Sequence, residues 1–589
     1  MAFVVKKGAA EEIIIPFYSK SEDIYYLFLP SYSDMTDVSI HFDGVDRVVF
    51  EDEGHSYELK KNMKIPELQL NKVYQAAFVK NSVTEAKIQF VMMHSANLPT
   101  LFVTTQSGSL ENVDADKTFS EAGSYVLMDA DGTLVYADDL SRITGRGNST
   151  WNYPKKSYSI KLDDPVDMLG MGSARSWILL SNVEDNTYLR NKITYDMAVD
   201  AGMTGAPESR YIDLYINHEY NGMYLLCEKI EPGDTRIPMT DLGLENEKLN
   251  KEMESAEPAY TELSKGVHLG SSPKDISGGY IVERDEYSKY ISEISGFRTP
   301  LLGDLYVIKS PEYASAEEVD YISRLFVDME EAVVSGDGIN GTTGESYLHY
   351  IDLRSFAQKY MIEEICKNNG GGATSSYFYK PEDAVSTQIF GGPVWDYDKA
   401  YGAVDGINGS TRDLCYLTQR NEGTTLFWYL NQHPEFREAV CECYEEFFAD
   451  YITGILDEKI EENISRIRCS ADMDGIRWQE IYGDIIPYEQ RVGVITNFLT
   501  ERKEFLDQVW AEDAEVCTVH FDAPEWYRDT YMSVMKGECL AAIPMREKGL
   551  ESNGRIFDGW YTEDGEEFDM TQSLYEDVTV YAKSHEVLQ

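Results

Sequence analysis

The sequence is poor in basic residues, and this shortage limits the partners that it can bind. Its 589 residues contain 52 Lys and Arg against 103 Asp and Glu, which gives a formal net charge of −51 at pH 7. Nucleic-acid backbones and anionic lipid surfaces are bound through clustered positive charge. We therefore expect neither nucleic acid nor an anionic membrane surface to be the main partner of this chain.

Long hydrophobic runs are also missing. No segment approaches the ~20 consecutive apolar residues that span a bilayer, so we expect no transmembrane segment. The opening residues, MAFVVKKGAAEEIIIPFYSK, lack the apolar central region of an export signal. The protein is expected to be cytosolic, or to be exported with a signal that this sequence does not include.

Cysteine and histidine are scarce and lack metal-binding spacing. The eight cysteines contain no C-x-x-C pair, and the nine histidines contain no H-E-x-x-H. A structural zinc site and a zinc protease are therefore not expected. Cys227 and Cys366 fall in apolar runs, which favours buried free thiols.

The sequence does contain what a packed core needs. Hydrophobic residues make up 43% of the chain and aromatic residues 12%, and the length allows roughly three to five structural units at ~100–200 residues each. Short alternating runs predict a β-rich domain over residues 1–95. The strand-like pattern continues from about 97, becomes helical between about 310 and 512, and returns to a period of two from 516.

Several elements can be predicted individually. The segment NTYLRNKITYDMAVDAG predicts a helix that Asp185 caps and Gly202 ends. The runs RYIDLYI and MYLLCEKI predict a hairpin that turns at Asn217 and His218, with His218 at positive φ. Residues 239–275 have poor periodicity and predict a mobile, irregular excursion.

The helical region has clearer signals. SAEEVDYISRLFVDMEEAVVS combines a cap with an apolar stripe, and YIDLRSFAQKYMIEEICKN carries a stripe that predicts core packing. Pro487 is expected to separate two of the later helices.

Three clusters could carry chemistry. The first is the Gly145–Trp151 turn, GRGNSTW, followed by Lys155, Lys156 and Lys161. Outward-facing N–H groups and nearby cations suit a phosphate cradle. The plainer alternative is a glycine turn with solvated lysines.

The other two clusters could bind a cation. In GGPVWDYD, Asp396 or Asp398 could bind Mg²⁺ together with phosphate oxygens and water, or both could be solvated acids in a turn. In KNNGGGATSS, Asn368 could bring a carboxamide oxygen to a metal. A helix C-cap is the plainer explanation of that loop.

Six blocks follow one another within roughly residues 97 to 510: GRGNSTW with KKSYSIKL, SWILLSNVEDNTYLRNKITYDMA, RYIDLYINHEYNGMYLLCEKI, GGYIVERD and GGPVWDYDKAYG. In this order they resemble the CotH kinase family, which is named after a bacterial spore coat protein. The resemblance implies a two-lobed atypical protein kinase that phosphorylates Ser or Thr of protein substrates, with ATP and Mg²⁺.

The resemblance also implies roles for single residues. On the nucleotide side these are Arg146 and Asn148 of the turn, Lys156 with Lys161 as an alternate, and Glu228 beside the base or ribose. On the metal side, Asp396 matches the metal-binding Asp, and Asn368 matches the Asn of the catalytic loop and is a second candidate ligand.

One position departs from the family pattern. The family's catalytic loop reads Asn, any residue, Asp, and Gly370 stands where that Asp belongs. Losing a general base typically costs ~10²–10⁴ in rate. Asp398 is a conceivable substitute. The alternatives are therefore an active kinase and a pseudokinase-like surface interaction protein that keeps the fold.

The last segment resembles a second family. Its opening VHF, its core FDGWYTEDGEEFD and its closing DVTVYA are similar to the Listeria–Bacteroides repeat, a β-grasp-like module of Gram-positive surface proteins. This implies an extracellular or cell-surface protein, with the spore coat or cytoplasm as alternatives. The expected fold is α+β, with a β-rich domain at 1–95, a CotH kinase-like domain at 96–512 and a β repeat at 513–589.

Overall fold

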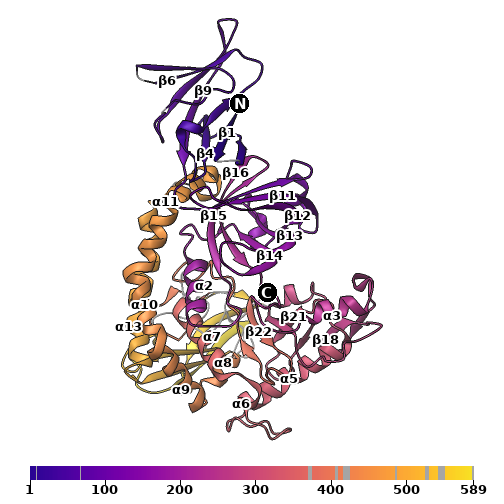
Figure 1. The fold of residues 1–589 in the computed structure, drawn as a ribbon. Helices are drawn as coiled ribbons and strands as arrows, with labels where there is room; N and C mark the ends of the chain where they lie inside the picture. The colour runs from indigo at the N-terminus through magenta and orange to yellow at the C-terminus, as the bar shows by residue number, and fades with distance from the viewer. Residues whose placement is uncertain are drawn as a thin grey trace. The chain divides into compact units, whose positions relative to one another are not determined.

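A computed structural model describes the chain in two compact units (Figure 1). It describes residues 1–589 except 8–9, 53, 67, 369–373, 405–408, 415–424, 484–486, 524–529, 541–548, 550, 553 and 587–589. Unit 1 comprises residues 1–186, 208–229 and 458–487, and unit 2 comprises residues 187–207, 230–457 and 488–589. Each unit is therefore assembled from segments that are distant in the sequence. None of the described helices is long and apolar enough to cross a membrane.

The first part of unit 1 is all β, as the alternating pattern predicts. A six-stranded sheet has the order β3-β4-β9-β8-β6-β7, and a three-stranded sheet has the order β2-β1-β5. The strands are β1 (Ala2–Lys7), β2 (Ala10–Ile14), β3 (Phe17–Ser19), β4 (Ile24–Leu29), β5 (Ser39–His41), β6 (Arg47–Asp52), β7 (His55–Leu59), β8 (Tyr74–Lys80) and β9 (Val83–His94).

The second part of unit 1 is a closed barrel. Its strands follow the order β10-β11-β12-β13-β14-β16-β15, and a parallel pairing of β10 with β15 closes it. Closure removes exposed sheet edges. The strands are β10 (Thr100–Thr105), β11 (Ser120–Met128), β12 (Leu134–Arg146), β13 (Ser157–Asp167), β14 (Ser173–Leu180), β15 (Ser209–Ile216) and β16 (Glu219–Glu228).

The β15–β16 hairpin confirms the predicted turn. Asn217 and His218 link the two strands with φ of 49° and 73°. Both central residues of a type I′ turn need positive φ. His218 therefore occupies a conformation in which non-glycine residues are uncommon.

Two helices from late in the sequence complete unit 1. They are α11 (Ile460–Arg477) and α12 (Gln479–Tyr482), and α11 packs against β16 and β9. At this contact Asp474 forms an ion pair with Lys155, with 2.8 Å between Oδ1 and Nζ. Helix α11, which comes late in the sequence, therefore packs against the barrel of unit 1 and stabilises it.

Unit 2 contains a seven-stranded sheet of order β17-β18-β20-β21-β19-β22-β23. Its strands are β17 (Pro258–Tyr260), β18 (Ser264–Val267), β19 (Tyr280–Arg284), β20 (Gly296–Arg298), β21 (Leu305–Ser310), β22 (Ser376–Lys380) and β23 (Phe390–Gly391). The prediction of an irregular excursion at 239–275 is wrong, because α3 (Leu242–Leu249), β17 and β18 lie there. These elements are too short for a periodic pattern to reveal them.

Unit 2 contains the helices α2 (Arg190–Asp200), α5 (Ala316–Val334) and α7 (Leu353–Cys366), of which α2 and α7 bear on the candidate site. Ser315 and Glu318 form a capping box on α5, as predicted. The predicted start of α2 is wrong, because Leu189 rather than Asp185 is its N-cap and no side chain caps it. The core-packing interpretation of α7 holds, since its described residues from Phe356 to Cys366 are all buried.

The remaining helical elements described in unit 2 are η3 (Met253–Ser255), α4 (Tyr287–Tyr290), α6 (Tyr347–Tyr350), α8 (Leu426–Leu430), α9 (Pro434–Cys443), the π-helix η6 (Tyr444–Phe448), α10 (Ala449–Gly454) and α13 (Tyr488–Trp510), while the π-helix η7 (Ile455–Lys459) crosses the sequence boundary between the units. Helix α13 begins directly after Pro487, as predicted. Cys227 in unit 1 and Cys366 in unit 2 are buried free thiols, which was also expected.

The chain closes with a five-stranded sheet of order β25-β24-β28-β27-β26, in which β24 and β28 are parallel. Its strands are β24 (Val516–Asp522), β25 (Thr530–Met535), β26 (Glu551–Ser552), β27 (Arg555–Tyr561) and β28 (Val578–Glu586). Two contacts join it to the rest of unit 2: Tyr531 stacks on Trp428 with 4.0 Å between ring centroids, and Glu538 accepts two hydrogen bonds from Arg412, at 2.6 and 3.1 Å.

Candidate functional site

The predicted site residues divide between the two units. Unit 2 contains Asn368, Asp396 and Asp398, and unit 1 contains Arg146, Asn148, Lys156, Lys161 and Glu228. Each group is described within its own unit.

The segment GGPVWDYD is held in place by helices α2 and α7. Tyr195 of α2 stacks on Trp395 with 5.7 Å between ring centroids. The main-chain N–H of Tyr397 donates to Asn191 Oδ1 at 2.7 Å, and the Tyr397 hydroxyl donates to Glu363 at 2.6 Å. Since α2 and α7 are largely buried, the segment between them has little freedom to move.

Asp396 lies at the centre of this segment and is the one member of it whose side chain is exposed. Its φ is 69°, in the left-handed region that non-glycine residues rarely adopt. Its carbonyl accepts from Asn368 Nδ2 at 3.1 Å, and its N–H donates to the Tyr195 hydroxyl at 3.4 Å. The unusual backbone is thus fixed on both sides, and it presents the carboxylate outward. Strained residues of this kind cluster at functional sites.

A residue that the sequence analysis missed also contacts Asp396. The hydroxyl of Ser375, itself at φ 56°, donates to Asp396 Oδ2 at 3.3 Å. Ser375 lies just before strand β22, so the strand signal that places β22 could have pointed to it. Asp398 is half-buried, and the buried Tyr397 separates it from Asp396 along the chain.

The position of Asn368 is set by the residue before it. Lys367 is the C-cap of α7 at φ 44°, so the predicted helix cap is present at this lysine. Its ammonium forms a fully buried ion pair with Asp413, whose carbonyl accepts from Arg502. The glycines of this loop, including Gly370, lie outside the described residues.

Helix α7 also carries a buried acid against this segment. Burial raises the pKa of Glu363 to about 7, against the opposing effects of Lys359 and of the Tyr397 hydroxyl bond. Burial likewise lowers the pKa of Lys359. The group that anchors Tyr397 therefore changes its protonation near neutral pH.

In unit 1, the glycine turn follows the end of strand β12. Arg146 is half-buried and pairs with Ser157 across the hairpin, and Asn148 is exposed. A Cβ on Gly145 would lie 2.2 Å from the Trp151 ring, so this glycine is required for the ring to pack. The Trp151 ring thus explains one glycine of the motif without any ligand.

The three lysines after the turn have different environments. Lys155 is fully buried, paired with Asp474, and donates to the Met223 carbonyl at 2.9 Å, so it is not solvated as the plainer interpretation expected. The Lys156 ammonium lies 4.5 Å from the Trp151 ring centroid and donates to the Trp151 carbonyl. Lys161 is exposed on β13. Lys156 therefore belongs to the turn, whereas Lys161 lies further along the strand.

Glu228 is buried at the end of β16. Its Oε2 accepts from the main-chain N–H of Glu208 at 2.9 Å. One oxygen of this carboxylate therefore has a structural role at the point where the barrel strand ends.

The donor set around Asp396 is sparse. Within the described ranges, no group of three or more His, Cys, Asp or Glu side chains could hold a metal ion. One carboxylate, one hydroxyl and one carboxamide lie together. Mg²⁺ commonly takes one or two carboxylates and completes its shell with water and phosphate oxygens, so these residues fit Mg²⁺ that arrives with a nucleotide.

Comparison with known families gives one match. A family model described as CotH kinase protein matches residues 143–506, which is more than half of the chain. The matched region includes every predicted site residue. A search of curated proteins finds no match.

Proposed function

The chain belongs to the CotH kinase family, and from this premise we propose that it transfers the γ-phosphoryl group of ATP to Ser or Thr hydroxyls of protein substrates, with Mg²⁺. Asp396 would hold the ion, with Asn368 as the second candidate ligand. Arg146, Asn148 and Lys156 would contact the phosphates, and Lys161 is the alternate cation.

The observation that carries this proposal is the presentation of Asp396. Its side chain is exposed while its backbone is held at positive φ by Asn368 and Tyr195. A solvated acid in an ordinary turn needs no such support. A carboxylate fixed in advance suits phosphoryl transfer, in which most of the protein's contribution is positioning and charge stabilisation.

Mg²⁺, when bound, would neutralise charge on the phosphates. The Asn368 amide nitrogen donates to the Asp396 carbonyl, and its carboxamide oxygen is the atom that would coordinate the ion. On the nucleotide side, Lys156 would exchange its contact with Trp151 for a phosphate oxygen. Glu228, whose Oε2 accepts from the Glu208 main-chain N–H, would contact the base or ribose through its carboxylate.

The second candidate function is a surface interaction protein that does not transfer phosphate. Gly370 favours it, because glycine cannot accept a proton. We propose Asp398 as the stand-in base for the active case. We further propose that the five-stranded C-terminal sheet is a Listeria–Bacteroides-type module of an extracellular protein; its mixed sheet order supports this. The spore coat and cytoplasm are the alternative locations.

The proposal is tested by calorimetric titration with ATP, with and without Mg²⁺, and by transfer of labelled phosphate. Asp396→Ala should abolish Mg²⁺-dependent binding while the thermal midpoint without nucleotide stays nearly constant. Asp450→Ala, which removes an exposed acid on α10, is the matched control.

The same assay separates the two functions. Transfer by the wild type supports the kinase, and its loss in Asp398→Asn supports the stand-in base. Binding with transfer only by Gly370→Asp indicates a site disabled at one position. If neither protein binds ATP, the kinase proposal is wrong and the interaction protein remains.

A further inference from the structure

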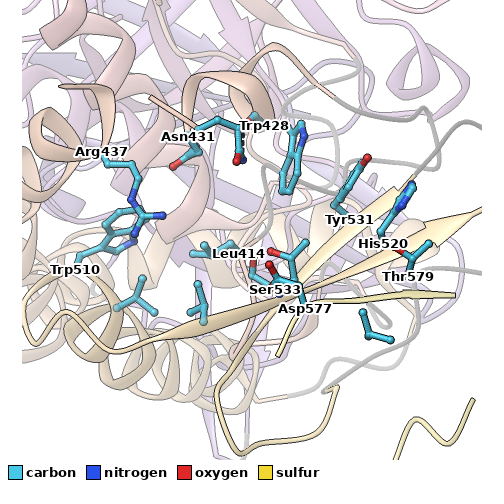
Figure 2. Close-up of a pocket in the computed structure, with 15 residues that line it drawn as sticks. Leu414, Trp428, Asn431, Arg437, Trp510, His520, Tyr531, Ser533, Asp577 and Thr579 are labelled. Carbon is cyan, nitrogen blue, oxygen red and sulfur yellow. Dashed lines mark hydrogen bonds between the residues drawn. The ribbon is translucent and has the colours of Figure 1, made fainter. Parts of the chain in front are cut away.

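A cavity of about 470 Å³ opens between the C-terminal sheet and the helices of unit 2 (Figure 2). Strands β24, β25 and β28 form one wall, and residues of α8, α9 and α13 form the other. Its volume lies in the range of pockets that hold small molecules, ~300–1,000 Å³. The predicted catalytic residues are not among those that line it, so it is a separate site.

One side of the cavity ends in a stack of aromatic rings. Trp428 stacks on Tyr531 at 4.0 Å with 22° between the ring planes, and Tyr531 stacks on His520 at 4.4 Å with 6°. Trp428 is half-buried and is the outer member of this stack, and in Figure 2 it lies between Tyr531 and the side chains of Asn431 and Arg437. One face of its indole is covered by Tyr531, and Trp428 itself lines the cavity.

Polar groups surround this indole. Asn431 is buried, and its amide nitrogen is committed to the Phe427 carbonyl at 2.8 Å, which leaves the carboxamide oxygen as an acceptor. The exposed Arg437 guanidinium lies 5.9 Å from the Trp510 ring centroid. The sheet contributes the hydroxyls of Ser533 and Thr579. The lining therefore combines a flat apolar surface with donors and acceptors around it.

The charge of the lining indicates a neutral ligand. Among the described residues that form it, Arg437 supplies a positive charge and Asp577 a negative one, so the two cancel. A site for phosphate or another anion needs an excess of cations. An apolar ligand would leave the buried Asn431 oxygen without a partner, which is costly.

We infer that this cavity binds a pyranose sugar. One face of a pyranose ring presents C–H groups, which can pack on the Trp428 indole, while its hydroxyls both donate and accept around the rim. Those hydroxyls match the Asn431 oxygen, the Arg437 guanidinium and the hydroxyl of Ser533. This binding is independent of ATP and of the proposed kinase activity.

The test is calorimetric titration of the full chain, without nucleotide, with N-acetylglucosamine, methyl glucopyranoside and methyl mannopyranoside, and with inorganic phosphate as the anionic comparison. We expect at least one sugar to bind with a Kd on the order of 1 mM. Hydrogen exchange with that sugar should show protection over 426–437, 516–522 and 530–535. Asp396→Ala should bind it unchanged, which separates this result from the fate of the kinase proposal.

Two variants locate the binding. Arg437→Met keeps the aliphatic stem and Ser533→Ala removes one hydroxyl, so each removes polar atoms only, and each should weaken binding roughly 3–10-fold. The matched controls are Arg354→Met and Ser465→Ala, exposed positions on α7 and α11. Thermal midpoints equal to wild type show that the variants are folded.

Binding of none of the three sugars overturns the inference, as does tighter binding of phosphate. Sugar binding without protection at 426–437, or binding that both pocket variants leave unchanged, also overturns it.

Discussion

The two groups of predicted site residues, one in each unit, share a local arrangement but differ in how far along the chain the functional side chain finds its contact. In unit 1 the fully buried Lys155 pairs with Asp474 and precedes Lys156. In unit 2 the fully buried Lys367 pairs with Asp413 and precedes Asn368. In each half, an ion pair out of reach of water fixes the main chain next to a predicted functional side chain.

The difference lies in what those functional side chains contact. Lys156 contacts Trp151, five residues before it in its own hairpin. Asn368 contacts Asp396, which belongs to a separate segment that α2 also holds. The contact of the Lys156 ammonium is therefore local, whereas that of Asn368 joins two segments that are distant in the sequence. We propose that Asp396 is fixed before a ligand binds and that Lys156 exchanges its contact with Trp151 for one with the ligand.

The strongest test of this comparison breaks each ion pair. Lys155→Met and Lys367→Met each leave a buried carboxylate without its counter-ion, which typically costs about 3–5 kcal/mol. Native-state hydrogen exchange, read at β16 for unit 1 and at α7 for unit 2, measures each loss. The double variant Lys155→Met/Asp474→Leu should recover most of it. A cost below 1 kcal/mol in either half would contradict the shared arrangement.

The second prediction distinguishes the units by pH. Burial, followed by the charge of Asp304, raises the pKa of Glu330 in unit 2 from 4.5 to about 8. A carboxyl group whose pKa is raised on folding contributes stability that is complete below pH 4.5 and is lost as the pH rises to about 8. Glu330→Gln lacks this loss. Its free energy of unfolding relative to wild type should therefore rise across that window, by as much as about 5 kcal/mol.

Asp213 in unit 1 is the control for that experiment. Burial raises its pKa only to about 6, because hydroxyls of Ser95, Ser470 and Tyr220 donate to its carboxylate. Asp213→Asn should gain on wild type only between about pH 4 and 6, by at most about 3 kcal/mol. Identical pH windows for the two variants would show that the units do not differ in this way.

The third prediction concerns Asn368. Asn368→Ala removes the bond to the Asp396 carbonyl and should cost about 1–2 kcal/mol of stability and roughly 10-fold in Mg²⁺-dependent ATP affinity. Asn463→Ala is the matched control, because that amide donates to the Lys459 carbonyl at 2.8 Å in α11. Equal ATP affinity in the two variants would show that Asn368 has no positioning role.

The smallest expected effect is at Lys156. Lys156→Met removes a half-exposed cation–π contact, so its cost in stability should be about 0.5–1 kcal/mol. The loss of ATP binding free energy should be larger than this loss of stability, because the ammonium would contact a phosphate. Thermal unfolding and calorimetry on one preparation separate the two effects. If Lys156→Met lost more free energy of unfolding than free energy of ATP binding, Lys156 would have a structural role instead.

Local signals predicted much of the fold. The capping box of α5, the β15–β16 hairpin and the start of α13 after Pro487 all depend on residues close in sequence. The start of α2 was missed because its first turn is buried without a side-chain cap, so packing determines it. Helix α11 could not be assigned to the barrel unit, because no local pattern reveals a contact between Asp474 and Lys155.

The candidate site was predicted only in part, because local motifs are visible in the sequence whereas burial and long-range contacts are not. Motifs identified Asp396 and Asn368, and the structure brings them together. They could not distinguish Lys155 from Lys156, since adjacent lysines look alike until burial separates them. Ser375 was missed because only its place just before β22 marks it, and that place does not reveal its contact with Asp396.

The pairing of Arg412 with Glu538 predicts which residues vary together among homologous sequences. It connects the closing sheet to the residue beside Asp413, the partner of Lys367, while Tyr531 covers one face of Trp428. A relative that lost the sheet would expose that indole and leave Arg412 without Glu538. We therefore expect homologous sequences without the sheet to have replaced both Trp428 and Arg412, and those with it to vary Arg412 and Glu538 together.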